Sequence, residues 1–295
     1  MTLSTANLSR RSFLKNLGSL LALSPLLRVP ILPEDEDERI CLSTFEFAVS
    51  RSLQKKPIRE VIVEVGKSFL GSPYEARTLE VAVDERLVVN LRAFDCVTYV
   101  ENVLVSARLI KKMDLDFSSY KQELQYVRYR RGIIDKYPSR LHYFSDWIHD
   151  NEQKDVVVNA TELLGGFPYK KSINYMTANR KRYMQLANDA YFEEMKKIEA
   201  ELSKRPMYYI PKERVQAAQN GIQSGDIIGI TTTIEGLDVI HTGLALRMAD
   251  GALHYLHAPN VRGKVKITKQ PLHEYLSINT IHSGIMVARP LEPQR

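Results

Sequence analysis

The sequence predicts an α+β protein, with helices in its first part and an antiparallel sheet in its last quarter. In the first part, apolar residues recur at every fourth position, as at Phe45, Val49 and Leu53, which is the spacing of one face of a helix. In the last quarter, short segments of high β-propensity are separated by turns that carry Gly or Asn, as in a meander of antiparallel strands. Helices followed by strands favour α+β over the alternating α/β classes.

The region before residue 95 contains two kinds of predicted element. Helical spacing extends over residues 43–70. Pro57 is expected to divide this run into two helices, because proline lacks the amide hydrogen and clashes with the preceding turn. Two β-prone segments follow at 78–83 and 86–91, and we expect them to pair as a hairpin.

A further helix is predicted to start at Asp95. The apolar spacing becomes helical there, through Val97, Val100 and Ala107. Asp is also a favoured N-cap residue, since its carboxylate accepts hydrogen bonds from the free amides of the first turn. Cys96 is therefore expected in the first turn of this helix.

The rest of the chain divides into a helical segment and a sheet. Residues 112–222 are expected to be mostly helical or irregular, and to form an insertion in a single domain that spans residues 43–295. A short helix is expected at 271–276. The predicted strands lie at 225–233, 238–246, 252–258, 264–268 and 283–291.

The first 28 residues predict an export signal, and hence a periplasmic protein. Arg10 and Arg11 precede an apolar stretch at 17–27, and a basic region followed by an apolar one is typical of such signals. The paired arginines indicate the twin-arginine type. The alternative is an amphipathic first helix. The stretch is shorter than the roughly 20 residues that cross a bilayer, so no integral membrane span is predicted. Residues 29–42 are expected to be an acidic linker.

Charge and ligand spacing narrow the range of partners. The formal net charge is +6, but four of the basic residues belong to residues 1–28, so the rest of the chain is nearly neutral. A nucleic-acid partner is not predicted, because it would require a concentrated basic surface. The sequence has no H-E-x-x-H and no paired cysteine spacing, so no metal or other cofactor is predicted.

Cys96 is the candidate nucleophile. A thiol reacts as its thiolate, and both a helix N-terminus and a nearby histidine lower the pKa of a cysteine. Cys41 is the other cysteine of the chain. In an exported protein the two could instead form a disulfide, and Cys96 could also be a buried packing residue. The local sequence leaves these three alternatives open.

His241 and His257 are the candidate partners of the thiol. His241 interrupts an otherwise apolar predicted strand. His254 and His257 are three residues apart in the next predicted strand, so they face opposite sides. Only one of them can share a face with His241. His257 lies at the strand end, where functional sites usually open.

The ordered set of motifs resembles a known group of enzymes. The segments "GSPY", "FDCVTYVE", "SGDIIGI", "IHTGLAL" and "YLHAPN" resemble, in the same order, those of the NlpC-type papain-like cell-wall peptidases and amidases. The segments "YRRGIIDKYPSRLHYFSDWI" and "HYLHAP" are similar to one branch, the N-acetylmuramoyl-L-alanine amidase-like family. The resemblance covers about residues 60–290. It implies a papain-like fold, with an antiparallel sheet packed on the nucleophile-bearing helix.

The same resemblance implies a role for each catalytic candidate. Cys96 would attack an amide carbonyl, and His241 would take the thiol proton and return it to the leaving amine. His257 would orient His241, as the third member of a triad does. The backbone amide of Cys96 and the hydroxyl of Tyr74 would stabilise the oxyanion. Asp95 is expected to cap the helix and to take no part in proton transfer.

Substrate-binding candidates lie in the predicted insertion and just before the nucleophile. Four side chains are expected to wall the site, with a structural role in the core of the insertion as the alternative: Arg140, His142, Tyr143 and Trp147. Asn90 and Arg92 could meet substrate carboxylates, since Arg binds them through two bonds, or could be surface residues. Ala76-Arg77 departs from the small or glycine-bearing pair expected of the family at this place in the rim.

These residues lead to three functional hypotheses. The first is a cysteine amidase that cuts between N-acetylmuramic acid and L-alanine in peptidoglycan fragments. The second is an endopeptidase that cuts after γ-D-glutamate with the same triad. The third, a wall-binding module with an inactive site, is disfavoured by the intact Cys96, His241 and His257. The oligomeric state is not predicted.

Overall fold

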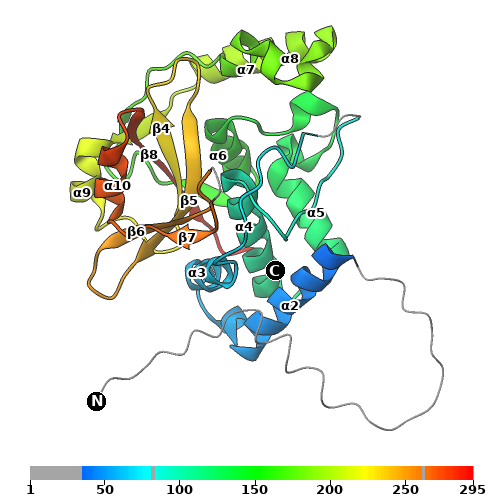
Figure 1. Ribbon diagram of the computed structural model, residues 1–295, viewed down its shortest axis with the longest axis vertical. Helices are drawn as coiled ribbons and strands as arrows, with labels where there is room; N and C mark the ends of the chain where they lie inside the picture. Colours follow the sequence, from blue (N-terminus) through cyan, green and yellow to red (C-terminus); the bar gives the residue numbers. More distant parts are fainter. Residues whose placement is uncertain (1–34, 81–83, 261–262, 295) are drawn as a thin grey trace, which may run out of the picture. The chain divides into compact units, whose positions relative to one another are not determined.

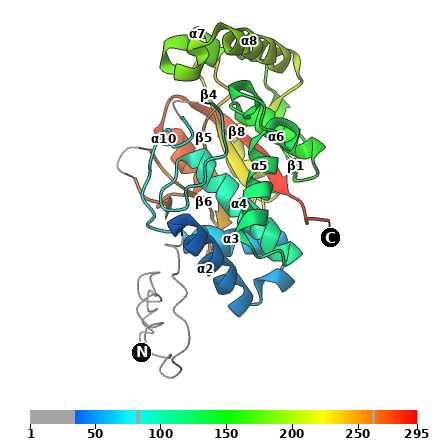
Figure 2. The same cartoon turned by 90° about the vertical axis from the view of Figure 1, so that its right-hand side faces the viewer.

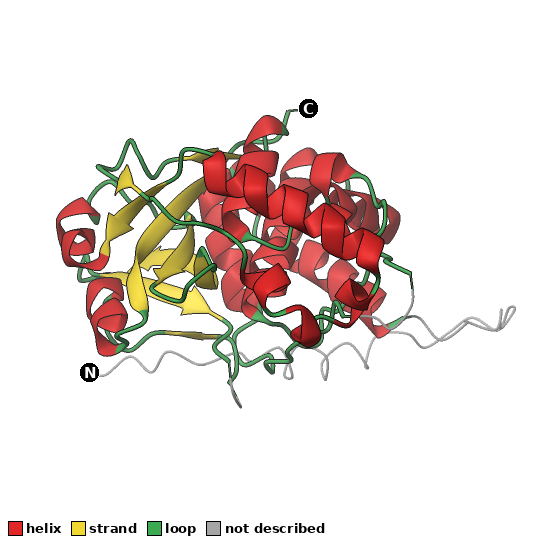
Figure 3. Cartoon of the chain, turned by 90° about the horizontal axis from the view of Figure 1, so that it is seen from above, coloured by secondary structure: helices red, strands yellow, loops and turns green. Residues whose placement is uncertain are grey.

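In the computed structural model, which describes residues 35–80, 84–260 and 263–294, an antiparallel sheet lies between two unequal groups of helices (Figure 1, Figure 3). The predicted α+β class is therefore confirmed. None of the helices in these ranges is long and apolar enough to cross a membrane. The predicted export signal, residues 1–28, lies outside the described residues.

The first helix begins inside the segment predicted to be a linker. Helix α2 spans Glu36–Ser50 and has three acidic residues in its first turn, where the positive end of the helix dipole stabilises carboxylates. Asp37 is buried and accepts a hydrogen bond from the backbone amide of Leu91 at 2.8 Å. Cys41 is buried as well. The prediction of a linker over 29–42 is thus wrong from residue 36 onwards, because this acidic run forms the first turn of α2, which is bonded to the backbone at Leu91.

Pro57 divides the next helical run as predicted. A 3-10 helix, η2 (Leu53–Lys55), precedes it, and helix α3 (Ile58–Ser68) follows it. The predicted hairpin is wrong for the residues described at 78–80 and 84–91, which form turns and irregular chain. Side chains, and not a partner strand, form hydrogen bonds with backbone groups of this segment. For example, the guanidinium of Arg128 donates to the carbonyl of Val88 at 2.6 Å.

Helix α4 (Cys96–Lys112) lies between the sheet and α5 (Figure 1) and is seen in front of the sheet in Figure 2. Its residues from Thr98 to Ile110 are all buried, so its polar side chains need partners inside the protein. Two of them form buried ion pairs that satisfy this need. Glu101 accepts from Arg128 at 2.7 Å, and Arg108 donates to Glu123 at 2.5 Å.

The sheet has the strand order β2-β3-β8-β4-β5-β6-β7, with β1 paired to β8, and neighbouring strands are antiparallel. The predicted strands and the predicted short helix of the last quarter are confirmed. They are β4 (Ile227–Thr232), β5 (Val239–Arg247), β6 (Leu253–His257), β7 (Lys266–Ile267), α10 (Leu272–Ile278) and β8 (His282–Pro290).

Both faces of the sheet are buried. Leu244 and Leu256 belong to the larger core, which the group around α4 completes. Ala245 and Tyr255, on the opposite face, pack in a smaller core with α10 and with α9 (Val215–Ala218). This alternation decides which side chains of β5 and β6 can meet, because neighbouring residues of a strand point to opposite faces.

The middle segment, 112–222, is only partly the helical insertion that was predicted. Its helices are α5 (Phe117–Arg128), η3 (Arg130–Gly132), η4 (Tyr137–Ser139), α6 (Phe144–Gln153), α7 (Tyr175–Ala178), η5 (Arg180–Arg182), η6 (Met184–Ala187), α8 (Asp189–Lys204), η7 (Lys212–Arg214) and α9. The segment also supplies β1 (Val157–Asn159), β2 (Phe167–Pro168) and β3 (Tyr208–Pro211). Since β1 and β3 both pair with β8, the segment extends the sheet as well as covering it.

Candidate active site

Cys96 is the first residue of α4 and lies at the N-terminus of this helix. Asp95 is the N-cap: its carboxylate accepts from the amide of Thr98 at 2.8 Å, and the hydroxyl of Thr98 accepts from the amide of Asp95 at 2.9 Å. This reciprocal capping box fixes the first turn. On the sheet side, the hydroxyl of Thr242 donates to the carbonyl of Cys96 at 2.8 Å. Cys96, a half-buried residue, is therefore held between a capped helix start and strand β5.

His241 and His257 meet across the β5–β6 ladder. Nε2 of His241 lies 2.6 Å from Nδ1 of His257. Leu244 pairs with Leu256, so Gly243 lies opposite His257, and His241 is the next side chain on that face. A Cβ atom at Gly243 would lie 2.8 Å from Cβ of His257, closer than carbon atoms pack. Glycine therefore makes room for the pair of imidazoles.

The paired imidazoles are packed among aromatic rings. The ring centroids of His241 and Tyr255 are 5.8 Å apart, and those of His257 and Tyr275 are 5.4 Å apart. Burial, followed by the charge of His282, lowers the pKa of His241 to about 4. Burial, followed by the neighbouring His241, lowers the pKa of His257 to about 2. Both rings are consequently neutral near pH 7.

The thiol is neutral near pH 7 as well. Burial, and then the carboxylate of Asp95, raise the pKa of Cys96 to about 11, while hydrogen bonds from Thr242 lower it. The sequence predicted a lowered pKa from the helix start and a nearby histidine, but burial and Asp95 outweigh these effects. Because Nε2 of His241 faces His257, Nδ1 is the nitrogen left for the thiol. The site holds an uncharged thiol and an uncharged base.

The two cysteines do not form the disulfide that the sequence left open. Cys41 and Cys96 are both free thiols. Cys41 is deeply buried in the packing of α2, and burial raises its pKa well above the ordinary range. Cys41 is therefore a structural residue.

Cys96 and His241 line one small cavity of about 80 Å³. Apolar side chains make up most of its wall: Val97, Leu141, Phe144, Trp147, Val239 and Ile240. His142 and Thr242 complete it. Such a wall strengthens electrostatic interactions, because it keeps the local dielectric low.

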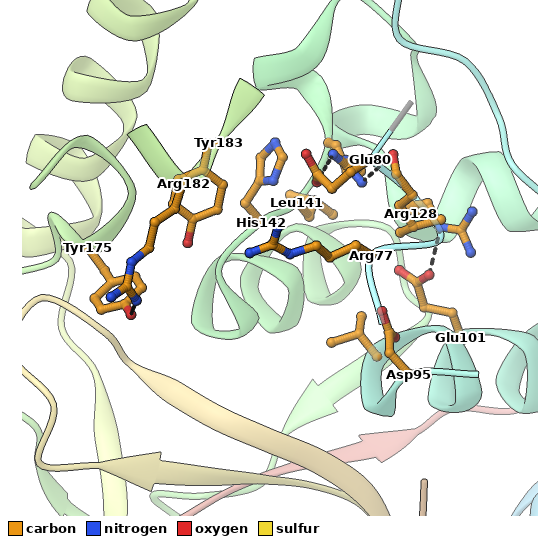
Figure 4. A pocket seen from close by; sticks show the side chains of 13 residues that line it. Arg77, Glu80, Asp95, Glu101, Arg128, Leu141, His142, Tyr175, Arg182 and Tyr183 are labelled. Atoms are coloured by element: carbon orange, nitrogen blue, oxygen red, sulfur yellow. Dashed lines mark hydrogen bonds and ion pairs between the residues drawn. The ribbon is translucent and has the colours of Figure 1, made fainter. Parts of the chain in front are cut away.

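A larger cavity of about 370 Å³ adjoins the small one (Figure 4). Val97, Leu141 and His142 line both cavities, so a molecule bound in the larger cavity would reach the thiol across a shared wall. The larger cavity is strongly charged. Its arginine and acidic lining residues are Arg77, Glu80, Asp95, Glu101, Arg128, Arg140 and Arg182.

The family model of N-acetylmuramoyl-L-alanine amidase-like proteins matches residues 64–285. The chain belongs to this family. The match includes helix α4 with Cys96, the residues that line the larger cavity, and the strands that carry His241 and His257.

Solved structures support this membership. A N-acetylmuramoyl-L-alanine amidase from Bacteroides uniformis is 38% identical, covers 79% of this chain and 99% of its own, and has a TM-score of 0.74. A putative xylanase from Bacteroides fragilis is 37% identical, covers 76% of this chain and 98% of its own, and has a TM-score of 0.72. A Legionella pneumophila protein at 21% identity shares the fold, with a TM-score of 0.66 over 86% of this chain and 95% of its own. Curated proteins gave no match.

Tyr74, the oxyanion candidate, belongs to a segment that runs beside the residues just before Cys96. Its segment pairs with Phe94, two residues before Cys96: the amide of Phe94 donates to Pro73, and the amide of Glu75 donates to Phe94, each at 3.0 Å. Burial, and then the charges of Cys96 and Asp95, raise the pKa of Tyr74 to about 12. Its hydroxyl is therefore protonated and can donate.

The structure divides the predicted substrate-binding residues into two groups. His142 lines both cavities, and its Nε2 lies 2.9 Å from the carbonyl of Tyr137. Trp147 lines the smaller cavity and stacks on Phe144 at 5.1 Å. Arg140 lines the larger cavity but is engaged by acidic side chains, as described below.

The other three candidates lie away from the cavity walls. Tyr143 is buried, and its hydroxyl donates to Glu199 at 2.7 Å, which ties α6 to α8. Asn90 closes a turn, since its side-chain oxygen accepts from the amides of Arg92 and Ala93 at 3.1 and 3.2 Å. Arg92 pairs with Asp37 on α2 at 3.3 Å. Each contact gives its residue a structural role.

Several residues of the site were missed by sequence reasoning. Thr242 anchors the helix start, Gly243 makes room for His257, and Asp238 accepts from the amide of Ser145 at the start of α6 at 2.7 Å. Period-two alternation in "IHTGLAL" could have indicated the first two, because it sends Thr242 to the face opposite His241 and Gly243 to the same face. Asp238 and Ser145 are far apart in the sequence, so no local pattern could have indicated their contact. In the described part of the chain, no cluster of three or more metal-ligating side chains occurs.

Proposed function

We propose that this protein is a cysteine amidase of papain-like NlpC type, which hydrolyses the amide between N-acetylmuramic acid and L-alanine in peptidoglycan fragments. One observation carries the proposal: a thiol at a helix start shares a small apolar cavity with an imidazole that a second imidazole orients at 2.6 Å. The family match and the similar amidase from Bacteroides uniformis support the choice of reaction.

The first half of the proposed reaction forms a thioester. Nδ1 of His241 takes the proton of the Cys96 thiol as the sulfur attacks the carbonyl carbon of the lactyl amide. The negative charge that develops on the carbonyl oxygen is stabilised by the amide of Cys96 and the hydroxyl of Tyr74. The C–N bond then breaks, and the protonated His241 gives its proton to the leaving amine of L-alanine.

The second half hydrolyses the thioester. His241 takes a proton from a water molecule, whose oxygen attacks the thioester carbonyl carbon. The C–S bond then breaks, the lactyl carboxylic acid is released, and the proton held by His241 returns to the sulfur of Cys96. His257 accepts the Nε2 proton of His241 throughout, which keeps Nδ1 free to act as the base. Because both rings are neutral before attack, a charged pair exists only while the reaction proceeds.

The xylanase name of one similar structure invites a comparison with glycoside hydrolysis. That reaction needs two carboxyl groups on either side of the scissile bond. Among the described residues that line the cavity of Cys96, none is acidic. Asp95, the residue before Cys96 in the chain, has one carboxylate oxygen held by the amide and hydroxyl of Thr98. These assignments favour amide over glycoside hydrolysis.

Digestion of a defined N-acetylmuramoyl tripeptide, read by mass spectrometry, tests the proposal. Release of the intact tripeptide supports the amidase. Release of muramoyl dipeptide would replace it with the endopeptidase activity. Absence of product, or a Cys96→Ala variant that retains activity, would overturn the cysteine mechanism.

We also propose that residues 1–28 export the protein to the periplasm through the twin-arginine route, on the basis of the paired Arg10 and Arg11. Replacement of both by Lys should retain the protein in the cytoplasmic fraction, while the unchanged chain appears in the periplasmic fraction. Equal distributions would contradict this route.

A further inference from the structure

The acidic side chains in the larger cavity are already committed to partners. Glu101 binds Arg128 at 2.7 Å, and both side chains are almost fully buried. Glu80 accepts from Arg140 at 2.8 Å, and Nε of Arg140 lies 3.3 Å from Glu85. The guanidinium groups of Arg128 and Arg140 are therefore neutralised by the protein itself.

Arg77 and Arg182 differ from these arginines, because no acidic side chain of the described residues lies within ion-pair distance of either. Nη1 of Arg182 donates to the hydroxyl of Tyr175 at 2.9 Å, a neutral partner. Both arginines are exposed residues that also line the cavity. The cavity lining therefore holds four arginines against three carboxylates, and Arg77 and Arg182 leave it with a net positive charge. The third carboxylate, Asp95, is held by Thr98 as the cap of α4.

The backbone directs Arg77 across this cavity. Arg77 has φ +63°, in the left-handed region that strains residues other than glycine. The amide of Glu80 donates to its carbonyl at 3.0 Å, which closes the turn. Figure 4 shows the Arg77 side chain extending over the opening toward the side of His142, with Arg182 and Tyr175 beyond its guanidinium end.

We propose that Arg77 and Arg182 bind a carboxylate of the substrate's peptide, so that the larger cavity holds the peptide while Cys96 attacks the amide next to it. The inference rests on the proposed function, since the substrate is taken to be a muramoyl peptide, whose peptide carries free carboxylates. Guanidinium groups match carboxylates in geometry and form charge-assisted hydrogen bonds with them. The cavity shares the wall formed by Val97, Leu141 and His142 with the site of the thiol.

The test compares N-acetylmuramoyl tripeptide with its carboxamide form, in which every peptide carboxyl is amidated. With the free acid, Arg77→Gln and Arg182→Gln should each raise KM by about 10-fold or more, because each removes a charged hydrogen bond. The value of kcat should stay within about twofold. With the amide, the unchanged protein should already show the raised KM, and the two variants should add little.

Lys181→Gln is the matched control. It removes one positive charge from the residue next to Arg182, and Lys181 does not line the cavity. This variant should leave KM for both substrates unchanged. Arg77→Lys, which keeps the charge but not the fork of donors, should restore part of the affinity. If KM rises equally for the acid and the amide in Arg77→Gln and Arg182→Gln, the carboxylate assignment is wrong.

Binding to the Cys96→Ala protein separates a failure of this inference from a failure of the proposed reaction. Calorimetry would measure the dissociation constants of the free acid and of the amide. Preference for the acid, lost in Arg182→Gln, supports the site even if no hydrolysis is seen. Equal binding of the two forms overturns it even if hydrolysis occurs. Arg182→Gln keeps the test open if Arg77→Gln fails to fold.

Discussion

The two adjoining cavities differ in what burial does to their ionisable groups. In the smaller one, burial makes Cys96 and His241 uncharged, and the walls are apolar. In the larger one, buried charges persist because Arg128 and Arg140 each meet a carboxylate. One cavity is therefore suited to moving a proton and the other to holding a charged ligand. The chain keeps the two tasks apart although they share three wall residues.

This difference follows from the cost of burying charge. An isolated buried charge is so unfavourable that the group shifts its pKa and neutralises, unless a partner lies close. Burial raises the pKa of Glu101, and the paired Arg128 opposes this effect. His241 has no acidic neighbour in the lining of its cavity, so burial lowers its pKa without opposition from a carboxylate there. Four substitutions test the two sides of this comparison, from the largest expected effect to the smallest.

Replacement of His257 should have the largest effect. His257→Leu removes the acceptor for Nε2 of His241, so the base is no longer held with Nδ1 toward the thiol. We expect kcat on the muramoyl tripeptide to fall by about 10²- to 10⁴-fold, the usual contribution of general acid–base catalysis. His257→Asn, whose side-chain oxygen can accept the same proton, is the control and should retain more activity. Equal activity in the two variants would contradict an orienting role.

Replacement of Arg128 should destabilise the wall of the larger cavity. Arg128→Met leaves Glu101 as a buried, unpaired carboxylate, and loss of one partner of a buried pair costs about 3–5 kcal/mol. Urea unfolding would measure this loss. Lys196→Met, which breaks an exposed pair with Glu193 on α8, is the control and should cost about 1 kcal/mol or less. If the two variants lost similar free energies of unfolding, the buried ion pair would be no more important for stability than the exposed one.

Gly243→Ala should impair catalysis through geometry alone. The added Cβ would lie 2.8 Å from Cβ of His257, so the imidazole pair must shift. A misplacement of about 1 Å can cost about 10²-fold in rate, and we expect kcat to fall by about 10- to 10²-fold. Gly251→Ala also strains the backbone, at φ +84°, but a Cβ there meets no neighbour. It should lower stability and leave kcat unchanged. An active Gly243→Ala protein would refute the packing requirement.

Asp95→Asn should have the smallest effect. The substitution keeps a favoured N-cap residue and removes the negative charge that helps to raise the pKa of Cys96 to about 11. The thiolate fraction at pH 8 should then rise, and iodoacetamide should label Cys96 a few times faster than in the unchanged protein. Cys41, whose pKa burial also raises, is the internal control and should stay slow. Slower labelling of Cys96 would contradict the assigned sign.

The raised pKa of Cys96 also affects stability. The folded state binds the thiol proton more tightly than the unfolded chain, whose thiol has the ordinary pKa of 9.0. This contribution to folding is fully present below pH 9 and is lost as the pH rises toward 11. The lowered pKa of His241 acts at the opposite end: its contribution is present above pH 6.5 and is lost as the pH falls toward 4.

The sequence alone determined the elements whose signals are local. The period of apolar residues located α4 and the strands of the last quarter, and Asp95 was recognisable as a cap because its partner is only three residues away. Alternation along a strand also showed that only one of His254 and His257 can face His241, and the position of His257 at the strand end favoured it. These features depend on neighbours in the chain, so the chain reveals them.

Tertiary structure decided whatever depends on partners that are distant in the sequence. The predicted acidic linker is a docked helix from residue 36 onwards, because the amide of Leu91 donates to Asp37. The predicted hairpin is irregular chain, in which Arg128 donates to the backbone carbonyl of Val88. Tertiary structure also set the charge states, because burial raised the pKa of Cys96 where the helix start alone predicted a lower one. Charge and packing act through space, so the order of residues leaves them undetermined until the fold brings the partners together.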